Sequence, residues 1–128
     1  MKPSIIIIDD EPEIIDVLSE FLRMRSIDVL ATGCNGKDAV ELFQKHTPDI
    51  VLMDLMMSKY DGFYGLENIH KIDPNAKVII HSGSIEQDDM ARLVEMKVSA
   101  IIKKPSGLNN LVDILDKLSL GDSIEICQ

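Results

Sequence analysis

Short runs of consecutive apolar residues, each ending in polar side chains, recur along the chain. The two clearest are the isoleucines at positions 5–8, which lead into three acids, and residues 50–53, which lead into Asp54. A short, fully apolar run is typical of a strand buried on both faces, as in a parallel sheet covered by helices. From such runs and the turn residues beside them, we predict five strands, over residues 4–8, 28–32, 50–53, 77–82 and 100–103.

Between these strands, apolar residues recur every three or four positions, as they do in helices that bury one face. Pro12 fits the first turn of a helix, where its missing N–H costs nothing, and Asn35 fits an N-cap. Ser84 and Gln87 have the spacing of a capping box, so we expect a helix to begin there and to carry the apolar residues Met90, Leu93 and Val94. The other predicted helices cover about residues 12–25, 36–46, 63–72 and 108–118.

Strands and helices therefore alternate five times, with short connections. This alternation predicts an α/β fold, a parallel sheet wrapped by helices through right-handed crossovers. The 128 residues suit a single domain with a sizeable core. We expect that domain to cover residues 1–120 and to leave 121–128 as a short tail without a predicted element.

The composition narrows the classes of partner. The formal net charge of −9 argues against direct binding of nucleic acid or of an anionic membrane, and favours basic surfaces or metal cations. No apolar run approaches the length of a membrane span, and we expect no signal peptide because Met1 leads at once into the first strand. Cys34 and Cys127 predict two reduced thiols and hence a cytoplasmic protein.

Chemically reactive side chains stand where the predicted strands end. Asp9 and Asp10 follow the first strand, Asp54 the third, Ser82 ends the fourth, and Lys104 follows the fifth. Because the carboxyl ends of parallel strands lie along one edge of the sheet, we expect these groups to meet in one crevice.

Three neighbouring acids repel one another, so a cation or a proton must relieve the strain. Their hard oxygen atoms favour Mg²⁺, which keeps positions open for water or phosphate. With a metal ion and Lys104 nearby, a phosphoryl group is the natural guest, and a carboxylate can act as its acceptor. Asp54 is the best placed, since it stands alone after a strand that we expect to be central.

The arrangement resembles the receiver domain of two-component response regulators. The resemblance covers about residues 4–118 and rests on IIIIDDEPEI, VLMDLMMSKYDG, HSG and KKP, in that order. It implies a flavodoxin-like, doubly wound (βα)5 fold with strand order 2-1-3-4-5.

The resemblance also implies a role for each residue. It makes Asp54 the phosphoacceptor, and Asp9 and Asp10 the acids that position Mg²⁺, with the backbone carbonyl of Met56 as a further metal ligand. Ser82 matches the hydroxyl residue that turns toward the phosphoryl group. Lys104 matches the lysine that pairs with the phosphate, and its bond to Pro105 is expected to be cis.

Two positions depart from the family's pattern. Ser58 replaces a proline four residues after the phosphoacceptor, which implies a less rigid loop. Ile101 stands where the family commonly has Tyr or Phe, so the aromatic half of the usual switch is missing.

The resemblance implies a phosphorylation-controlled switch rather than a turnover enzyme. A sensor histidine kinase or a phosphotransfer protein would donate the phosphoryl group, and an unidentified protein would read the result. An alternative is a phosphatase or phosphotransferase of the haloacid-dehalogenase type, but such enzymes need a second Asp where this chain has Met56. A flavodoxin-like flavin or nucleotide binder would need a Gly-, Ser- or Thr-rich loop after the first strand, where the chain has acids and Pro12.

Overall fold

The computed structural model describes residues 3–104 and 107–119, and within them it contains the five predicted strands and five helices. The strands are β1 (Ser4–Ile8), β2 (Asp28–Gly33), β3 (Ile50–Met53), β4 (Lys77–Ser82) and β5 (Ala100–Lys103). The helices are α1 (Pro12–Met24), α2 (Gly36–His46), α3 (Gly62–Ile72), α4 (Gln87–Glu95) and α5 (Leu108–Ser119). Residues 121–128, predicted to form a tail, lie outside the described residues, as does Pro105.

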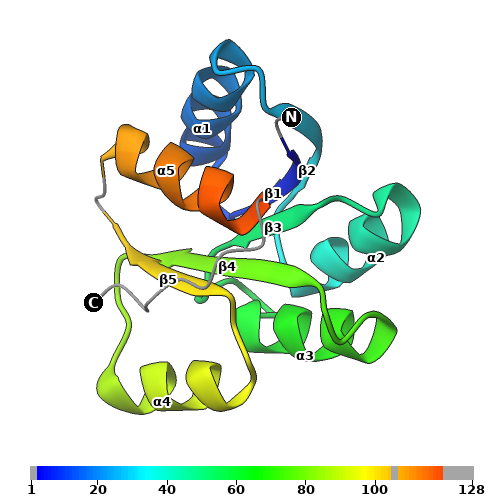
Figure 1. Cartoon of the computed structure of the whole chain (residues 1–128). Helices are drawn as coiled ribbons and strands as arrows, with labels where there is room; N and C mark the ends of the chain where they lie inside the picture. The colour runs from blue at the N-terminus through cyan, green and yellow to red at the C-terminus, as the bar shows by residue number, and fades with distance from the viewer. Residues whose placement is uncertain (1–2, 105–106, 120–128) are drawn as a thin grey trace.

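The sheet has the predicted order, β2-β1-β3-β4-β5, and all its neighbouring strands run parallel. Helices α1 and α5 cover one face, and α2, α3 and α4 cover the other (Figure 1). Ile8 of β1 is in register with Met53 of β3, so the two acids that follow these residues leave the sheet side by side. The fold is therefore the flavodoxin-like, doubly wound fold that the sequence predicts.

Alternate residues of the strands supply two separate cores. On the α2–α4 face, Ile6 and Ile8 pack with Phe43, Leu66 and Leu93. On the α1 and α5 face, their neighbours on β1 pack against Leu18, Leu22 and Leu115, among others. Because each central strand is apolar on both faces, it reads in the sequence as an unbroken apolar run.

The helix starts follow local rules in most cases. The side chain of Asn35 accepts the N–H of Asp38 at 2.9 Å, as predicted for an N-cap. At Gly36 an added Cβ would lie 2.3 Å from the backbone oxygen of Asp61, so only glycine allows α2 to approach the start of α3 this closely.

The start of α4 differs from the prediction. The helix begins at Gln87 with Glu86 as N-cap, and the carboxylate of Asp89 accepts the Glu86 N–H at 3.4 Å. The predicted capping box at Ser84 was wrong, because Glu86 and Asp89 form the capping box of this helix instead. Of the apolar residues that the sequence places on this helix, Leu93 is fully buried, whereas Val94 is 53% exposed.

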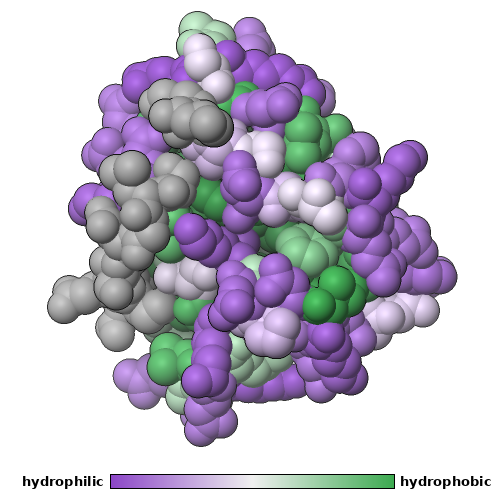
Figure 2. All heavy atoms as spheres, turned by 45° about the vertical axis from the view of Figure 1, so that its right-hand side comes forward, coloured by the Kyte–Doolittle hydropathy of each residue, from purple (hydrophilic) through white to green (hydrophobic). Residues whose placement is uncertain are grey.

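Polar side chains dominate the face shown in Figure 2, where apolar residues form only separate patches. None of the helices in the described part of the chain combines the length and apolar character that crossing a bilayer requires. Cys34 is exposed and carries a free thiol, as predicted, whereas Cys127 lies outside the described residues.

A buried hydroxyl on α1 allows a test of this packing. Ser19 is 5% exposed, and its Oγ has no hydrogen-bond partner among the residues that the structure describes. We expect Ser19→Ala to raise the free energy of unfolding by about 1 kcal/mol, because it removes an unpaired buried hydroxyl and improves helix propensity. Urea unfolding measures this, with exposed Glu20→Ala as the control for propensity alone. A less stable Ser19→Ala variant would contradict the unpaired state of this hydroxyl.

Candidate phosphoryl-transfer site

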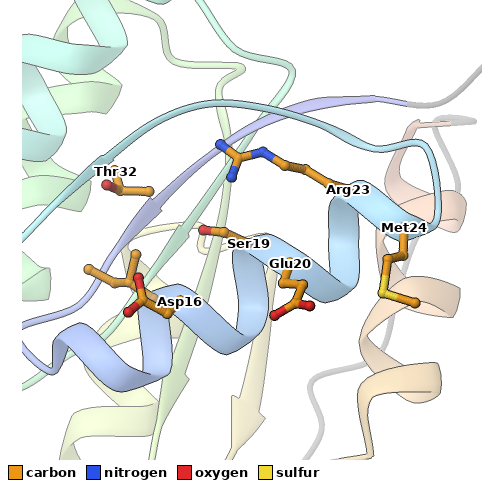
Figure 3. A pocket seen from close by; sticks show the side chains of 7 residues that line it. Asp16, Ser19, Glu20, Arg23, Met24 and Thr32 are labelled. Atoms are coloured by element: carbon orange, nitrogen blue, oxygen red, sulfur yellow. The ribbon is translucent and has the colours of Figure 1, made fainter.

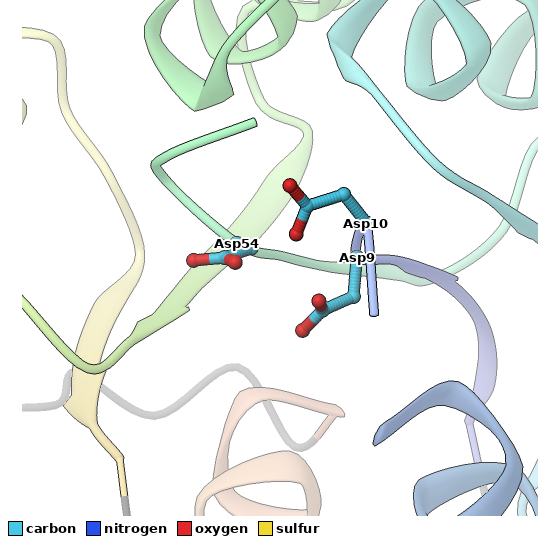
Figure 4. Close-up of side chains that lie close together, drawn as sticks. All are labelled: Asp9, Asp10 and Asp54. Carbon is cyan, nitrogen blue, oxygen red and sulfur yellow. The ribbon is translucent and has the colours of Figure 1, made fainter. Parts of the chain in front are cut away.

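Three carboxylates meet at the carboxyl edge of the sheet. Asp9 and Asp10 follow β1, Asp54 follows β3, and one oxygen atom from each lies within 4.8 Å of the others. Figure 4 shows the three side chains turned toward a common space. Asp9 and Asp54 are only 3% and 7% exposed, whereas Asp10 is exposed. The structure therefore places the three predicted acids together.

Backbone bonds that continue past the strands fix where these side chains begin. The N–H of Asp54 donates to Ile8 of β1 at 2.9 Å, and that of Lys104 donates to Ser82 of β4 at 2.9 Å. The N–H of Asp9 donates to the last residue of β2 at 3.1 Å. Groups far apart in the sequence are thus held to the sheet as rigidly as the strands themselves.

Lys104 reaches back across the edge to the acids. Its Nζ lies 2.7 Å from Oδ2 of Asp9 and 3.6 Å from Oδ2 of Asp54. The lysine side chain is 16% exposed, so both ion pairs are largely shielded from water. Lys104 is therefore a counter-charge for two nearly buried carboxylates.

Backbone N–H groups orient the second oxygen of each buried acid. Leu55 donates to Oδ1 of Asp54 at 2.8 Å, and Glu11 donates to Oδ1 of Asp9 at 2.9 Å. These donors are backbone groups in the turns after the strands. Every residue except proline has such an N–H, so the side-chain sequence does not reveal their role. The arrangement leaves Oδ2 of Asp54 facing Lys104.

Burial and charge act in opposite directions on this cluster. Burial raises the pKa of Asp54, although the charge of Lys104 and a hydrogen bond from Ser82 lower it. For Lys104, burial alone would lower the pKa, but the hydrogen bond to Asp9 and the charge of Asp54 raise it overall. Lys104 is therefore charged at neutral pH, and the uncompensated negative charge of the cluster would be relieved by a further cation.

The remaining predicted residues are placed as follows. Ser82 is buried and hydrogen-bonds the Asp54 carboxylate, while Ile101 is wholly buried within β5. The Met56 side chain is 59% exposed, two residues beyond Asp54, and a metal-binding role for its backbone carbonyl stays a prediction. The predicted cis bond to Pro105 falls outside the described residues.

His81, in β4, lies beside this cluster. It is 7% exposed, and burial, together with the charge of Lys104, lowers its pKa to about 4 against the opposing effect of Asp9. The imidazole is consequently neutral at physiological pH, so Lys104 is the cation that faces Asp9 and Asp54 from this side.

One cavity lies apart from the acidic cluster. It has a volume of about 550 Å³ and lies between α1 and β2 (Figure 3). Its walls include none of the residues predicted for the site. The residues that line it are Ile15, Asp16, Ser19, Glu20, Arg23, Met24 and Thr32.

The sequence matches the response regulator receiver domain family over residues 5–116. The chain belongs to this family. It is 31% identical to the chemotaxis protein CheY of Thermotoga maritima over 119 residues, which cover 93% of this chain and 99% of that protein. A solved structure of the CheX–CheY complex of Borrelia burgdorferi with BeF3 and Mg²⁺ matches with a TM-score of 0.85 and 24% identity, over 91% of this chain and 88% of that one.

A second kind of relative is longer. The receiver domain is 30% identical to the response regulator protein VraR of Staphylococcus saprophyticus over 125 residues, which are 97% of this chain but 60% of VraR. The similarity to VraR is therefore confined to part of that regulator.

The raised pKa of Asp54 leads to a prediction about stability. A carboxyl group whose pKa is higher in the folded state stabilises the fold at acid pH, and this stabilisation is lost as pH rises through the folded-state pKa. Asp54→Asn should thus be more stable than wild type at neutral pH, by about 1 kcal/mol, because it removes an incompletely compensated buried charge. The difference should shrink as pH falls through the raised folded-state pKa, and it should stop changing below about 4, where the carboxyl is protonated in both states.

Urea unfolding across this pH range measures the effect, with exposed Asp113→Asn on α5 as the control. A variant that is less stable than wild type at neutral pH would mean that the attraction of Lys104 outweighs the cost of burying Asp54.

Proposed function

We propose that this receiver domain is a phosphoacceptor switch, which takes a phosphoryl group on Asp54 and thereby changes the binding of a protein partner. The observation that carries the proposal is the placement of Asp54, with its Oδ2 3.6 Å from the Lys104 ammonium and inside a cluster of three acids. A receiver domain of this family with that geometry has an acceptor carboxylate, a counter-charge and a set of metal ligands at one point.

The donor set fits Mg²⁺. Asp9, Asp10 and Asp54 offer hard oxygen atoms within 4.8 Å of one another, and Asp10 is open to solvent. When bound, Mg²⁺ would neutralise charge that develops on the phosphoryl oxygen atoms. The Borrelia burgdorferi complex, which contains BeF3 and Mg²⁺, supports this assignment by analogy.

The chain's own residues would divide the remaining work. An oxygen of Asp54 forms a bond to phosphorus while the bond from phosphorus to the donor atom breaks, and the donor departs with that electron pair. Oδ2 is suited to this role because Oδ1 already accepts the Leu55 N–H. The Lys104 ammonium and the Ser82 hydroxyl would then bind phosphoryl oxygen atoms, so both would exchange their present contacts with Asp54 for contacts with the phosphate.

A sensor histidine kinase or a phosphotransfer protein would supply the phosphoryl group, in the cytoplasm. The domain would catalyse its own phosphorylation and dephosphorylation without being a turnover enzyme. Its output would be a change in affinity for a downstream protein, and nothing in its net charge of −9 favours direct contact with nucleic acid.

Transmission from the site would depend on Ser82 rather than on an aromatic side chain. Ile101 is wholly buried in the core below α4, where it has no polar atom and no ring to swing outward. A movement of Ser82 toward the phosphate would instead pull directly on the connection to α4, which starts five residues later.

The haloacid-dehalogenase alternative is not favoured. Its general acid would stand two residues after the nucleophile, and Met56 has no proton to transfer. Steady hydrolysis of p-nitrophenyl phosphate by the wild-type chain would be evidence for this alternative.

Phosphorylation can be tested directly by intact mass. Incubation with acetyl phosphate and Mg²⁺ should add one phosphoryl group to wild type and none to Asp54→Asn. Lys104→Met should fold and should accept the phosphoryl group at least about tenfold more slowly, because it removes charge stabilisation of the transferred group. Asp28→Asn, at the opposite end of the sheet, is the matched control and should react like wild type. An adduct on Asp54→Asn would place the acceptor elsewhere.

Metal binding can be tested without phosphorylation. Saturating Mg²⁺ should raise the free energy of unfolding of wild type, by about 2–3 kcal/mol at a hundredfold excess over the dissociation constant. Asp10→Asn should lose most of this increase, since it removes the charge of the exposed carboxylate in the cluster that would hold the ion. Equal stabilisation of Asp10→Asn and wild type would remove Asp10 from the metal site.

A further inference from the structure

A histidine far from the acidic cluster bridges two backbone carbonyl groups. His70 lies in the last turn of α3 and is half-buried. Its Nδ1 is 3.2 Å from the carbonyl oxygen of Met96, and its Nε2 is 3.1 Å from that of Ala76. Both ring nitrogens thus face hydrogen-bond acceptors.

Only one protonation state satisfies both contacts. A neutral imidazole has one N–H, so its second nitrogen would direct a lone pair at a carbonyl oxygen. The doubly protonated ring donates to both carbonyl groups. The dipoles of the helices act in the same direction, because the ring is at the C-terminal end of α3 and meets the C-cap residue of α4, where positive charge is favoured.

The two carbonyl groups belong to segments that matter for the position of α4. Met96 is the C-cap of α4, and Ala76 immediately precedes β4, the strand that ends in Ser82. Leu93 is the only fully buried residue of this helix, Met90 packs partly buried against the same core, and the guanidinium of Arg92 lies 3.9 Å from the centre of the Phe63 ring on α3. The bond to Met96 adds a polar attachment to these contacts.

Charged side chains of both signs surround the ring. Glu67 of α3 and Arg92 and Glu95 of α4 line the same cavity of about 420 Å³. The segments that carry the two carbonyl groups contribute Asp73, whose carboxylate accepts an N–H within its own turn, and Lys97. The two glutamates and Asp73 favour a positive charge on the ring, whereas Arg92 and Lys97 disfavour it. Because these effects oppose one another, the two carbonyl groups are the contacts that favour the doubly protonated ring.

We propose that His70 is a proton-dependent latch, which fastens the C-terminal end of α4 to α3 and to the entrance of β4 when its ring is doubly protonated. Loss of one proton removes one of the two hydrogen bonds, so the neutral ring no longer joins α4 to the entrance of β4. The latch acts on the helix that follows Ser82, and it responds to pH without needing a phosphoryl group on Asp54. The proposal therefore stands independently of the proposed phosphorylation.

Nuclear magnetic resonance of the wild-type chain tests the latch directly. In a titration between about pH 5.5 and 8.5, the ring signals of His70 report its second proton. The amide groups of Lys97 and Lys77, which follow the two carbonyl groups, should shift with the same midpoint as the ring. The ring signals of His46 on α2 are the control, and any change in them should leave these amides unmoved. Independent or absent shifts at Lys97 and Lys77 would overturn the proposal.

Hydrogen exchange then measures the consequence for α4. At the acid end of the range, protection of the amides at residues 93–97 should fall about fivefold in His70→Gln, the change expected for one lost hydrogen bond. At the alkaline end the two proteins should differ less, and His46→Gln should match wild type throughout. A loss of protection that is equal at both ends would make His70 a plain packing residue. Should His70→Gln fail to fold, the wild-type titration decides alone.

Discussion

The ion pairs of Lys104 with Asp9 and Asp54 are the interaction on which the acidic cluster at the carboxyl edge of the sheet depends. Two nearly buried carboxylates and a third exposed one lie within 4.8 Å of each other, which is stable only beside a cation. Lys104 supplies that charge from the opposite side of the crevice, at 2.7 Å and 3.6 Å. One lysine faces three carboxylates, so the cluster keeps an excess of negative charge. In the proposed function, a metal ion would compensate this excess, and Lys104 would exchange its carboxylate partners for the phosphoryl group.

The rest of the fold serves to hold these groups in place. The register of β1 with β3, and the bonds that continue to Asp54 and Lys104, give the side chains a common origin on a sheet buried on both faces. Two dense cores of isoleucine, leucine and valine leave the sheet little freedom to deform. Any change that follows chemistry at Asp54 must then appear in the segments beyond the strands.

Helix α4 is the most lightly attached of these segments. It buries one side chain fully, stacks one arginine on Phe63, and meets His70 at its C-cap. Its N-terminal connection leads to Ser82, and its C-cap carbonyl group lies 3.2 Å from a ring nitrogen of His70. In the two proposals made above, phosphorylation would therefore act on one end of this helix and protonation of His70 on the other.

The sequence by itself determined the five strands, the order of elements and the acids at the strand ends. Its apolar runs and caps such as Asn35 are local signals that tertiary contacts did not override. Only the tertiary structure decided the rest. A lone buried carboxylate is costly, yet Asp54 is only 7% exposed, since Lys104, fifty residues away in the chain, lies 3.6 Å from it. The start of α4, the exposure of Val94 and the two carbonyl groups around His70 likewise depend on which segments meet in space. A contact between distant segments leaves no pattern in either segment alone, because its energy depends on two residues that are far apart in the sequence.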